Sequence, residues 1–482
     1  MKYFKILASI ALLLILMPML TTSCVKEEEW LCEDARLDFS CDTVAFDTVF
    51  VTMGTTTKQL KVYNNNEQPV RISSVTLQGG KLSRFRLNVD GDTSLVVRNI
   101  EIAAHDSIFI FVQANINPNS SAEPFLIEDA IQFNFEESQK QIPLTAYGRN
   151  AVYHVAKPGN WTSIIDCDNW DHSLPHVILG YAAVDSLCTL NLMAGDKIYF
   201  GNDAVLLVYN GATLKVQGSH DNPVLFTSLR HDGWYDTLPG QWGYIWLYQG
   251  SRNNEIDWAV IENGTIGLVA DTLANSNPTL TIRNSRILNQ SRAGLLGQGS
   301  YIEGDNLLIT NCGQATLALQ YGGRYRFRNS TFADYWPYSG NRRKNPSVIL
   351  NNLYVNGETG NAYPRPLEQA YFDNCIICGN YGSSNGENGE VLLDIDPSTG
   401  HNIRFRNCMV KSSQIDEYCQ DCIPFANPQF DTASNHRYHP SANSPFVGQG
   451  NSAYITLPND LDNTPRSMPP TIGAFELKGN KR

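Results

Sequence analysis

The sequence has almost no segment with the apolar period of a helix, and it is short of positive charge. After residue 23, hardly any stretch keeps a 3.6-residue apolar period for three turns. The chain has 36 Lys and Arg against 48 Asp and Glu, so its formal net charge is −12. An acidic surface repels phosphate backbones, and no basic cluster outweighs it. These absences predict a nearly all-β protein and argue against nucleic acid as a partner.

The apolar run near the N-terminus, residues 6–20, is shorter than a membrane span. Two lysines precede the run and small residues follow it, which is typical of a secretory signal peptide. Cys24 directly follows Ser23, and this arrangement resembles a lipobox, in which the cysteine is acylated and becomes the new N-terminus. One departure is Thr21, which stands where leucine is usual. We therefore expect a signal peptide over residues 1–23 and lipidation at Cys24, with simple secretion after cleavage nearby as the alternative.

Residues 24–35 form a short acidic segment that includes Lys26 and three consecutive glutamates at 27–29. A solvated linker has the same composition. A cysteine followed by one residue, a lysine and acidic residues also resembles the signal by which some Gram-negative bacteria send lipoproteins to the outer face of the outer membrane. The expected location is therefore the outer membrane, with a lipid anchor and the chain facing the cell exterior.

Residues 36–150 contain short segments of alternating apolar and polar residues, separated by turn clusters such as 64–66 and 117–119. Strands at this spacing, with one apolar face each, pack as a two-sheet sandwich. The unit resembles the immunoglobulin-like domains that stand between an anchor and a second domain. Because a fold alone implies no function, we favour a spacer over a dedicated binding role.

A repeat of about 22 residues dominates the second part of the chain. Segments that end in asparagine recur there, and the successive asparagines are 21, 22, 23, 22, 23 and 33 residues apart. One coil of a parallel β-helix, with three short strands and three turns, uses about 22 residues. The longest interval is one coil with an insertion, which we place at residues 382–389 because Gly, Asn and Ser dominate there. The repeating asparagines are Asn263, Asn284, Asn306, Asn329, Asn351, Asn374 and Asn407.

Apolar residues stand two positions before and three positions after most of these asparagines, which predicts that both positions face inward. The asparagines fall at bends, where stacked amides hydrogen-bond from coil to coil. This pattern resembles the asparagine ladders of the pectate-lyase-like right-handed parallel β-helix, and we expect that fold over residues 151–440. The two columns are Ile261, Ile282, Gly304, Phe327, Ile349, Phe372 and Phe405, and Ile266, Ile287, Ile309, Phe332, Tyr354, Ile377 and Val410.

Ten cysteines follow the expected lipidation site, and an oxidising compartment permits disulfides without requiring them. Cys375-x-x-Cys378 and Cys419-x-x-Cys422 have a spacing that suggests zinc in a cytosolic protein. Exported proteins more often oxidise paired cysteines, and Cys375 shares a column with Cys408 where small buried thiols fit. We predict no metal and no cofactor. The plausible disulfides are Cys32 with Cys41 and Cys167 with Cys188.

The column one residue before each asparagine alternates in sign wherever two charged residues adjoin. Neighbouring coils lie about 4.8 Å apart, so this column predicts a surface ladder worth a fraction of a kcal/mol per pair. A hydrolase of this fold would need converging carboxylates, and a lyase a calcium site that faces a basic residue. We find neither, because Asp203, Asp257 and Asp271 are scattered. The column is Glu262, Arg283, Asp305, Arg328, Leu350, Asp373 and Arg406.

Aromatic residues give the best indication of a ligand. In the run 242–248, period-2 alternation predicts that one set is buried, either Ile245 and Leu247 or the aromatic residues opposite them. Aromatic residues in turns are better candidates for platforms on which sugar rings stack, with arginines meeting acidic groups. Packing over the coil edges is the alternative, and it is favoured because large apolar side chains are mostly buried. The candidate glycan contacts are Trp234, Tyr235, Trp336, Tyr338, Arg342 and Arg343.

The C-terminal segment, residues 441–482, ends in the pattern Ile-Gly-Ala-Phe-Glu at 472–476. This pattern resembles the closing segment of bacterial surface β-helix proteins of the type called choice-of-anchor Q. The last coil of a β-helix presents open strand edges unless something covers it. We therefore expect a cap in which Asp460, Asp462 and Arg466 take part, in preference to metal binding at these residues.

Two functions from different classes remain. The first is a non-catalytic cell-surface lipoprotein whose β-helix binds glycan or another envelope component. The alternative is a polysaccharide lyase or glycoside hydrolase of pectate-lyase-like fold. The sequence leaves catalysis open and favours the first function, because the repeat is visible and a catalytic cluster is not. The expected partners are the lipid anchor in the outer membrane and a polysaccharide ligand.

Overall fold

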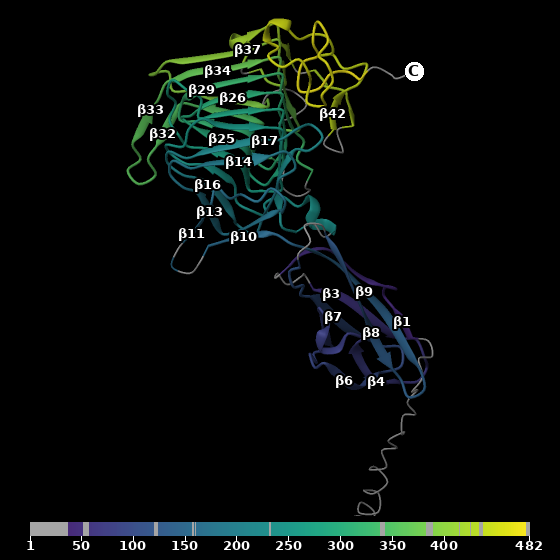
Figure 1. Cartoon of the computed structure of the whole chain (residues 1–482). Coiled ribbons are helices and arrows are strands. Elements are labelled where there is room, and N and C mark those ends of the chain that lie inside the picture. Colours follow the sequence, from purple (N-terminus) through teal and green to yellow (C-terminus); the bar gives the residue numbers. More distant parts are fainter. Residues whose placement is uncertain are drawn as a thin grey trace, which may run out of the picture. The chain divides into compact units, whose positions relative to one another are not determined.

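The computed structural model shows an all-β protein, in which the described residues form strands and short 3-10 turns but no α-helix (Figure 1). The chain divides into two compact units, residues 1–150 and 151–482. The structure describes residues 37–51, 57–119, 124–156, 159, 161–230, 233–337, 343–381, 389–413, 415–424, 426–432 and 437–478. No helix in these ranges is long and apolar enough to cross a membrane.

The first unit is a sandwich of two sheets. Alternation along its strands sends every second side chain into one core, as in β7, where Ile108, Ile110 and Val112 are buried. All strand pairs are antiparallel except β2 with β9, which are parallel. One sheet has the order β1 (Leu37–Phe39), β3 (Lys58–Asn64), β7 (Ser107–Ala114), β5 (Phe85–Val89), and the other β2 (Val44–Phe50), β9 (Gln139–Arg149), β8 (Phe125–Asn134), β4 (Val70–Leu77), β6 (Val96–Ile102), with the 3-10 turn η2 (Gly80–Leu82) after β4.

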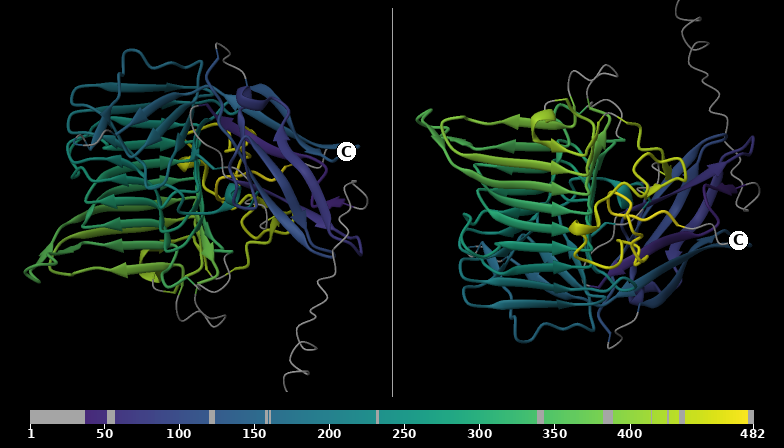
Figure 2. Two further views of the ribbon diagram at one scale, coloured as in Figure 1. Left: turned by 90° about the horizontal axis from the view of Figure 1, so that it is seen from below. Right: turned by 90° about the horizontal axis from the view of Figure 1, so that it is seen from above.

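The second unit is a parallel β-helix of three sheets, and from β12 to β37 each coil adds one strand to each sheet in turn (Figures 1 and 2). Sheet 1 has the order β10 (Val152–Val155), β12 (His176–Leu179), β15 (Lys197–Phe200), β18 (Val224–Ser228), β21 (Ala259–Glu262), β24 (Arg286–Gln290), β27 (Leu308–Cys312), β30 (Thr331–Asp334), β35 (Ile376–Gly379), β38 (Met409–Val410), β40 (Ile423–Pro424). Sheet 2 has the order β11 (Thr162–Ile164), β13 (Tyr181–Val184), β16 (Val205–Val208), β19 (Ile245–Leu247), β22 (Ile266–Ala270), β25 (Ala293–Gln298), β28 (Ala315–Gln320), β31 (Val348–Asn351), β36 (Val391–Asp394).

Sheet 3 completes each coil, and every pairing within the three sheets is parallel. Its order is β14 (Thr189–Met193), β17 (Thr213–Gln217), β20 (Asn254–Asp257), β23 (Leu280–Arg283), β26 (Tyr301–Asp305), β29 (Gly323–Arg328), β34 (Leu367–Asp373), β37 (His401–Arg406), β39 (Cys419–Gln420). Outside the three sheets lie the hairpins β32 (Leu353–Val355) with β33 (Ala362–Pro364) and β41 (Phe430–Thr432) with β42 (Arg437–Pro440), and the 3-10 turns η3 (Gly233–Thr237), η4 (Asp416–Tyr418) and η6 (Ser452–Tyr454).

Two asparagine ladders mark the corners of the β-helix, where the sequence predicted one. Five of the predicted asparagines follow strands of sheet 3 with positive φ, and Asn306 donates to the Asn284 amide oxygen at 3.0 Å. Asn263 instead follows β21 of sheet 1 and starts a second ladder, in which Asn289 donates to its amide oxygen. The first ladder contains Asn284, Asn306, Asn329, Asn374 and Asn407.

Asn351 belongs to neither ladder, so the predicted alignment is wrong there. It ends β31 of sheet 2, and its amide oxygen accepts from the backbone N–H of Tyr321 at 2.9 Å. β29 pairs directly with β34, which makes the interval from Asn329 to Asn374 a single coil with two insertions. The predicted asparagines were evenly spaced here because the two insertions give this one coil the length of two. For the same reason Tyr354 lies in the β32–β33 hairpin and not in an inward column.

The C-terminal segment lies along the flank of the β-helix, where the sequence predicted an end cap (Figure 2, yellow). Ile472 and Phe475 are buried in one cluster with outward-facing residues of sheet 1, including Ile376. Asparagines of the first ladder also donate to backbone carbonyls of this segment, as Asn374 does to Asn451 at 3.0 Å. The segment therefore covers the outer face of sheet 1 over several coils.

The three residues predicted to act in a cap fasten this segment instead. Asp460 accepts from the backbone N–H groups of Asp462, Thr464 and Glu476. Asp462 pairs with Arg286 of β24 at 3.0 Å, and buried Arg466 pairs with Glu476 at 3.4 Å. These contacts tie the segment to itself and to the side of the coils.

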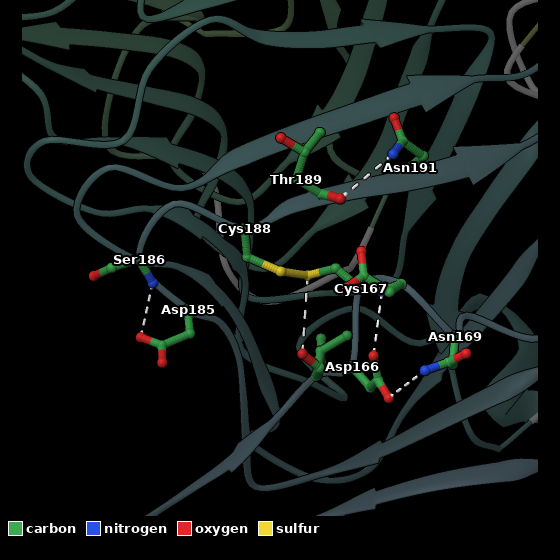
Figure 3. Close-up of a disulfide and its surroundings, with 10 residues drawn as sticks. Asp166, Cys167, Asn169, Asp185, Ser186, Cys188, Thr189 and Asn191 are labelled. Atoms are coloured by element: carbon green, nitrogen blue, oxygen red, sulfur yellow. Dashed lines mark hydrogen bonds between the residues drawn. A yellow bond between two sulfur atoms is a disulfide. The ribbon is translucent and has the colours of Figure 1, made fainter.

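Cys167 and Cys188 form a disulfide, as the sequence predicted (Figure 3). The bond closes a loop of 21 residues in sequence separation near the first coils. Cys32 lies outside the described residues. We expect Cys167→Ser with Cys188→Ser to lower the free energy of unfolding by about 3 kcal/mol, because the reduced chain gains loop entropy when unfolded. Urea denaturation of the wild type and the variant, and of the wild type with and without reductant, measures this change. An unchanged urea midpoint in both comparisons would contradict a stabilising role of the disulfide.

A pair of buried histidines makes the first coils sensitive to acid. The ring nitrogens of His154 on β10 and His176 on β12 lie 2.9 Å apart, and Trp170 stacks on the His176 ring. Burial lowers the pKa of His154 from 6.5 to about 4, with His176 as a second cause. The unfolded chain therefore binds more protons between these pH values, and the stability that is complete above pH 6.5 falls as the pH drops toward 4.

We expect this one group to remove about 3 kcal/mol of stability over that interval, since one pKa unit is about 1.4 kcal/mol. Urea denaturation at about pH 7 and at about pH 4.5 compares the wild type with His154→Phe. The variant keeps the ring stack and removes the titration, so its stability should change less with pH. An equal loss in both proteins would assign the acid sensitivity to other groups.

Candidate functional site

The predicted aromatic pair Trp234 and Tyr235 lies on η3, at the corner between sheets 1 and 2. The Trp234 side chain is exposed, and the Arg230 guanidinium lies 3.3 Å from the centre of the Tyr235 ring. The second asparagine ladder holds the turn, because Asn263 and Asn289 donate to its last two carbonyls. Trp234 is thus presented on a fixed turn, while the face of Tyr235 is occupied by an arginine.

Of the other predicted glycan contacts, the structure describes Trp336 and Arg343. Trp336 is half-buried in the turn between β30 and β31, on the same edge of the β-helix, where a side chain at Gly313 would meet its ring. Tyr338 and Arg342 lie outside the described residues. Arg343 was predicted to meet acidic groups of a glycan, and its burial contradicts that prediction. Its guanidinium is buried between the carboxylates of Asp334, at 2.9 Å, and Glu390, at 2.6 Å.

An aromatic surface does form, on the outer side of sheet 2. In β19, Ile245 and Leu247 point into the core and Trp246 points outward, which settles the alternation that the sequence left open. Trp242 is fully buried and stacks on Phe200 at 4.1 Å. Five rings make up the surface, which we call the aromatic face: Tyr181, Tyr209, Tyr244, Trp246 and Tyr248.

Contacts between these rings hold the aromatic face in place. Trp246 lies edge-on to Tyr244 at 5.8 Å and to Tyr248 at 5.1 Å, and Tyr248 stacks on Tyr209 at 5.4 Å. Tyr181 and Tyr209 are exposed, and the other three rings are half-buried. Each ring therefore has part of its surface open and part supported, which favours stacking with little loss of side-chain entropy.

Polar groups border the aromatic face. Burial raises the pKa of the Tyr244 phenol, and the Tyr181 hydroxyl beside it has the same effect, while Arg292 opposes it. Burial also raises the pKa of Asp271, which follows β22. Ring surfaces next to hydroxyl, carboxylate and guanidinium groups are the combination that binds the apolar face and the hydroxyls of a sugar.

An apolar row continues from the aromatic face across sheet 2. The strand register aligns Trp246 with Val269, and the alignment continues to Leu392 on β36. Val269, Ile266 and Ala293 form a small cluster against Tyr244 and Trp246 outside the main core. Within the described residues the outward row carries no charged side chain; it consists of Ala183, Leu207, Trp246, Val269, Leu296, Ala318, Ile349 and Leu392.

Sheet 3 has a different outer surface, where the charge column predicted from the sequence is found in part. Its register places the column on adjacent strands, and Arg406 pairs with Asp373 at 2.6 Å. Glu262 and Leu350 do not belong to it, because they lie in sheets 1 and 2. The column contains Arg283, Asp305, Arg328, Asp373 and Arg406.

Cysteines of both motifs occupy the repeating position at which the sequence predicted small thiols. Cys375 and Cys408 occupy equivalent positions on successive coils, and each thiol donates to strand carbonyls, as Cys408 does to Phe372 at 3.2 Å. Cys422 takes the same position on the last coil. Among the residues that the structure describes, no group of three or more His, Cys, Asp and Glu side chains could hold a metal ion.

Comparisons with known proteins give no family. No family model matches the chain, and no curated protein matches it. Among solved structures, the pectate lyase Pel9A is 13% identical over 68% of this chain and 96% of that one, with a TM-score of 0.27. The catalytic unit of a GH87 α-1,3-glucanase from Streptomyces thermodiastaticus is 12% identical over 76% of this chain and 88% of that one, with a TM-score of 0.22.

A family 123 glycoside hydrolase from Clostridium perfringens is 10% identical, with a TM-score of 0.16. That match covers 24% of this chain and only 27% of the hydrolase. The parallel pairing of the three sheets defines the β-helix, and the outer sides of these sheets carry the surfaces that could bind a ligand.

Proposed function

We propose that this chain is a cell-surface lipoprotein whose β-helix binds a glycan, without catalysis, on the aromatic face. The observation that carries the proposal is the set of five adjoining rings on the outer side of β13, β16 and β19 and at their ends. Sugar rings stack on such surfaces through their apolar faces, and the bordering polar groups meet the hydroxyls.

The anchor belongs to the same proposal. Cys24 lies outside the described residues, and the support for its lipidation is the signal-like segment before it and the acidic segment after it. Lipidation there places the protein in the outer membrane, and the acidic signal directs it to the exterior. The immunoglobulin-like unit then serves as a spacer between the anchor and the β-helix.

Affinity electrophoresis against neutral and acidic polysaccharides tests the proposal. For a polysaccharide that retards the wild type, we expect Trp246→Ala to weaken binding about tenfold, which is about 1.4 kcal/mol. The matched control is Phe109→Ala, which removes an exposed ring from β7 in the first unit. If every polysaccharide that binds retarded the wild type and Trp246→Ala equally, glycan binding on the aromatic face would be contradicted.

A further inference from the structure

The outer side of sheet 3 carries a second surface, which differs in chemistry from the aromatic face. Six arginines occupy outward positions on β23, β29 and β37, which are alternate strands of sheet 3. We call this surface the arginine strip: Arg283, Arg324, Arg326, Arg328, Arg404 and Arg406. No equivalent row of cations is found on the described residues of sheet 2, whose outer row is apolar.

Carboxylates accompany the strip but do not balance it. The strands from β23 to β37 carry four carboxylates, so the six arginines leave a formal charge of +2 there, on a chain whose net charge is −12. The four are Glu303, Asp305, Glu368 and Asp373. Asp257 on the adjoining strand β20 lies beside Arg283. Asp373 is fully buried, and its carboxylate lies 2.6 Å from the Arg406 guanidinium and 3.4 Å from the Arg326 guanidinium. Asp305 is also buried, where Thr456 and Asn329 donate to it. Most of the charge that meets solvent is therefore guanidinium.

Two of the arginines have open donor groups. Arg283 is exposed, and within the described residues its side chain makes no hydrogen bond or ion pair. Arg404 is exposed as well, and its guanidinium lies 5.1 Å from the centre of the Tyr371 ring. A guanidinium presents a planar set of N–H donors that matches two oxygens of a carboxylate or sulfate. The open guanidinium groups of these two side chains can therefore donate hydrogen bonds to oxyanions of a ligand.

The strip also offers a concave contact. A pocket of about 210 Å³ opens between Thr281, Arg283, Glu303 and Arg328, and Thr456 of the C-terminal segment forms one wall. Farther along the strip, the half-buried Tyr301 and Tyr371 rings lie beside arginines. Rings next to guanidinium groups fit a chain in which sugar rings alternate with charged substituents.

The distance between successive arginines in the strip predicts the length of the repeating unit in its ligand. Arg283, Arg328 and Arg406 share one column and stand on every second strand. Neighbouring strands are about 4.8 Å apart, so these guanidinium groups recur at about 10 Å along the coil stack. That interval is close to the length of a disaccharide in an extended polysaccharide, and it is longer than a single sugar residue.

We propose that the arginine strip binds a linear acidic polysaccharide with one oxyanion-bearing sugar in each disaccharide, aligned along the stack of coils. The oxyanion is a carboxylate or a sulfate ester, which share the donor geometry described above. This site is separate from the aromatic face, and it stands whether or not that face binds a glycan.

Isothermal titration of the full chain tests the proposal with four defined chains at low ionic strength. Hyaluronan carries a carboxylate on every second sugar, chondroitin sulfate adds a sulfate ester, polygalacturonate carries a carboxylate on every sugar, and dextran is neutral. We expect hyaluronan, chondroitin sulfate or both to bind more tightly than polygalacturonate, with no binding of dextran to the strip, and the bound chains identify the oxyanion. Added salt should weaken binding, because it screens the exposed guanidinium groups.

The double variant Arg283→Gln with Arg404→Gln should lose at least tenfold in affinity for these chains. Both residues are exposed, so the fold is expected to survive, and thermal denaturation verifies this. Arg98→Gln, in the first unit, removes an exposed arginine as the matched control. Trp246→Ala should leave this binding unchanged, which separates the strip from the aromatic face. Unaltered affinity in the double variant, no binding of either alternating chain, or equally tight polygalacturonate binding would overturn the proposal.

Discussion

Phe372→Ala is expected to lower the free energy of unfolding of the β-helix by about 4 kcal/mol. Phe372 is fully buried on β34, and its ring stacks on Phe405 at 4.9 Å and Phe327 at 5.6 Å. Phe332 of sheet 1 meets the same ring edge-on at 6.2 Å. Deleting the ring leaves a cavity between coils, and the hydrogen-bonded strands around it cannot close inward without breaking their pairing.

Urea denaturation followed by circular dichroism measures this loss. The control is Phe109→Ala, because that ring is exposed on the sandwich and its removal creates no cavity. We expect the control to change stability by less than about 1 kcal/mol. If both variants unfolded at the wild-type urea concentration, the phenylalanine column could not be part of a tightly packed interior.

Arg343→Met is expected to be nearly as damaging, at about 3 to 5 kcal/mol. The substitution keeps most of the side-chain volume and removes the only charge placed between the Asp334 and Glu390 carboxylates among the described residues. Both carboxylates are fully buried, and Glu390 also accepts from the backbone N–H of Ser347 at 3.0 Å. Two buried acids would be left near each other without a counter-charge.

Acid should partly rescue this variant. Burial raises the pKa of Asp334 to about 6, so its carboxylate accepts a proton in mildly acidic solution more readily than an exposed one. Denaturation of Arg343→Met and wild type at pH 7 and at about pH 5 should therefore show a smaller difference at the lower pH. Arg324→Met, at a partly exposed position, is the control. A difference that grew on acidification would contradict the buried-pair explanation.

The parallel β-helix could be predicted because its coils repeat a local signal. Asn284, Asn306 and Asn329 each end a strand of sheet 3 with positive φ, a conformation that asparagine tolerates better than most residues. Their spacing gave the coil length directly. The prediction failed at Asn351, because two insertions in one coil happened to add the length of another coil, and nothing local distinguishes the two cases.

The candidate sites were harder to predict, because they depend on contacts between coils. Period-2 alternation shows that Trp246 and Leu247 face opposite sides, but only the register with β16 and β22 shows which side is the core. Tyr181 and Tyr209 join Trp246 through that same register, and sequence analysis missed both. Arg343 looked like a surface residue for a related reason, since its partner Glu390 is 47 residues away.

The most direct test of the proposed function exposes the purified wild-type chain to a panel of neutral and acidic polysaccharides and records binding and products together. Products are detected as new reducing ends, which both hydrolysis and lyase cleavage release, and as the absorbance of unsaturated sugars, which lyase cleavage alone produces. We expect saturable binding of at least one polysaccharide with no product. Release of product, or no binding to any polysaccharide, would contradict a non-catalytic glycan-binding β-helix.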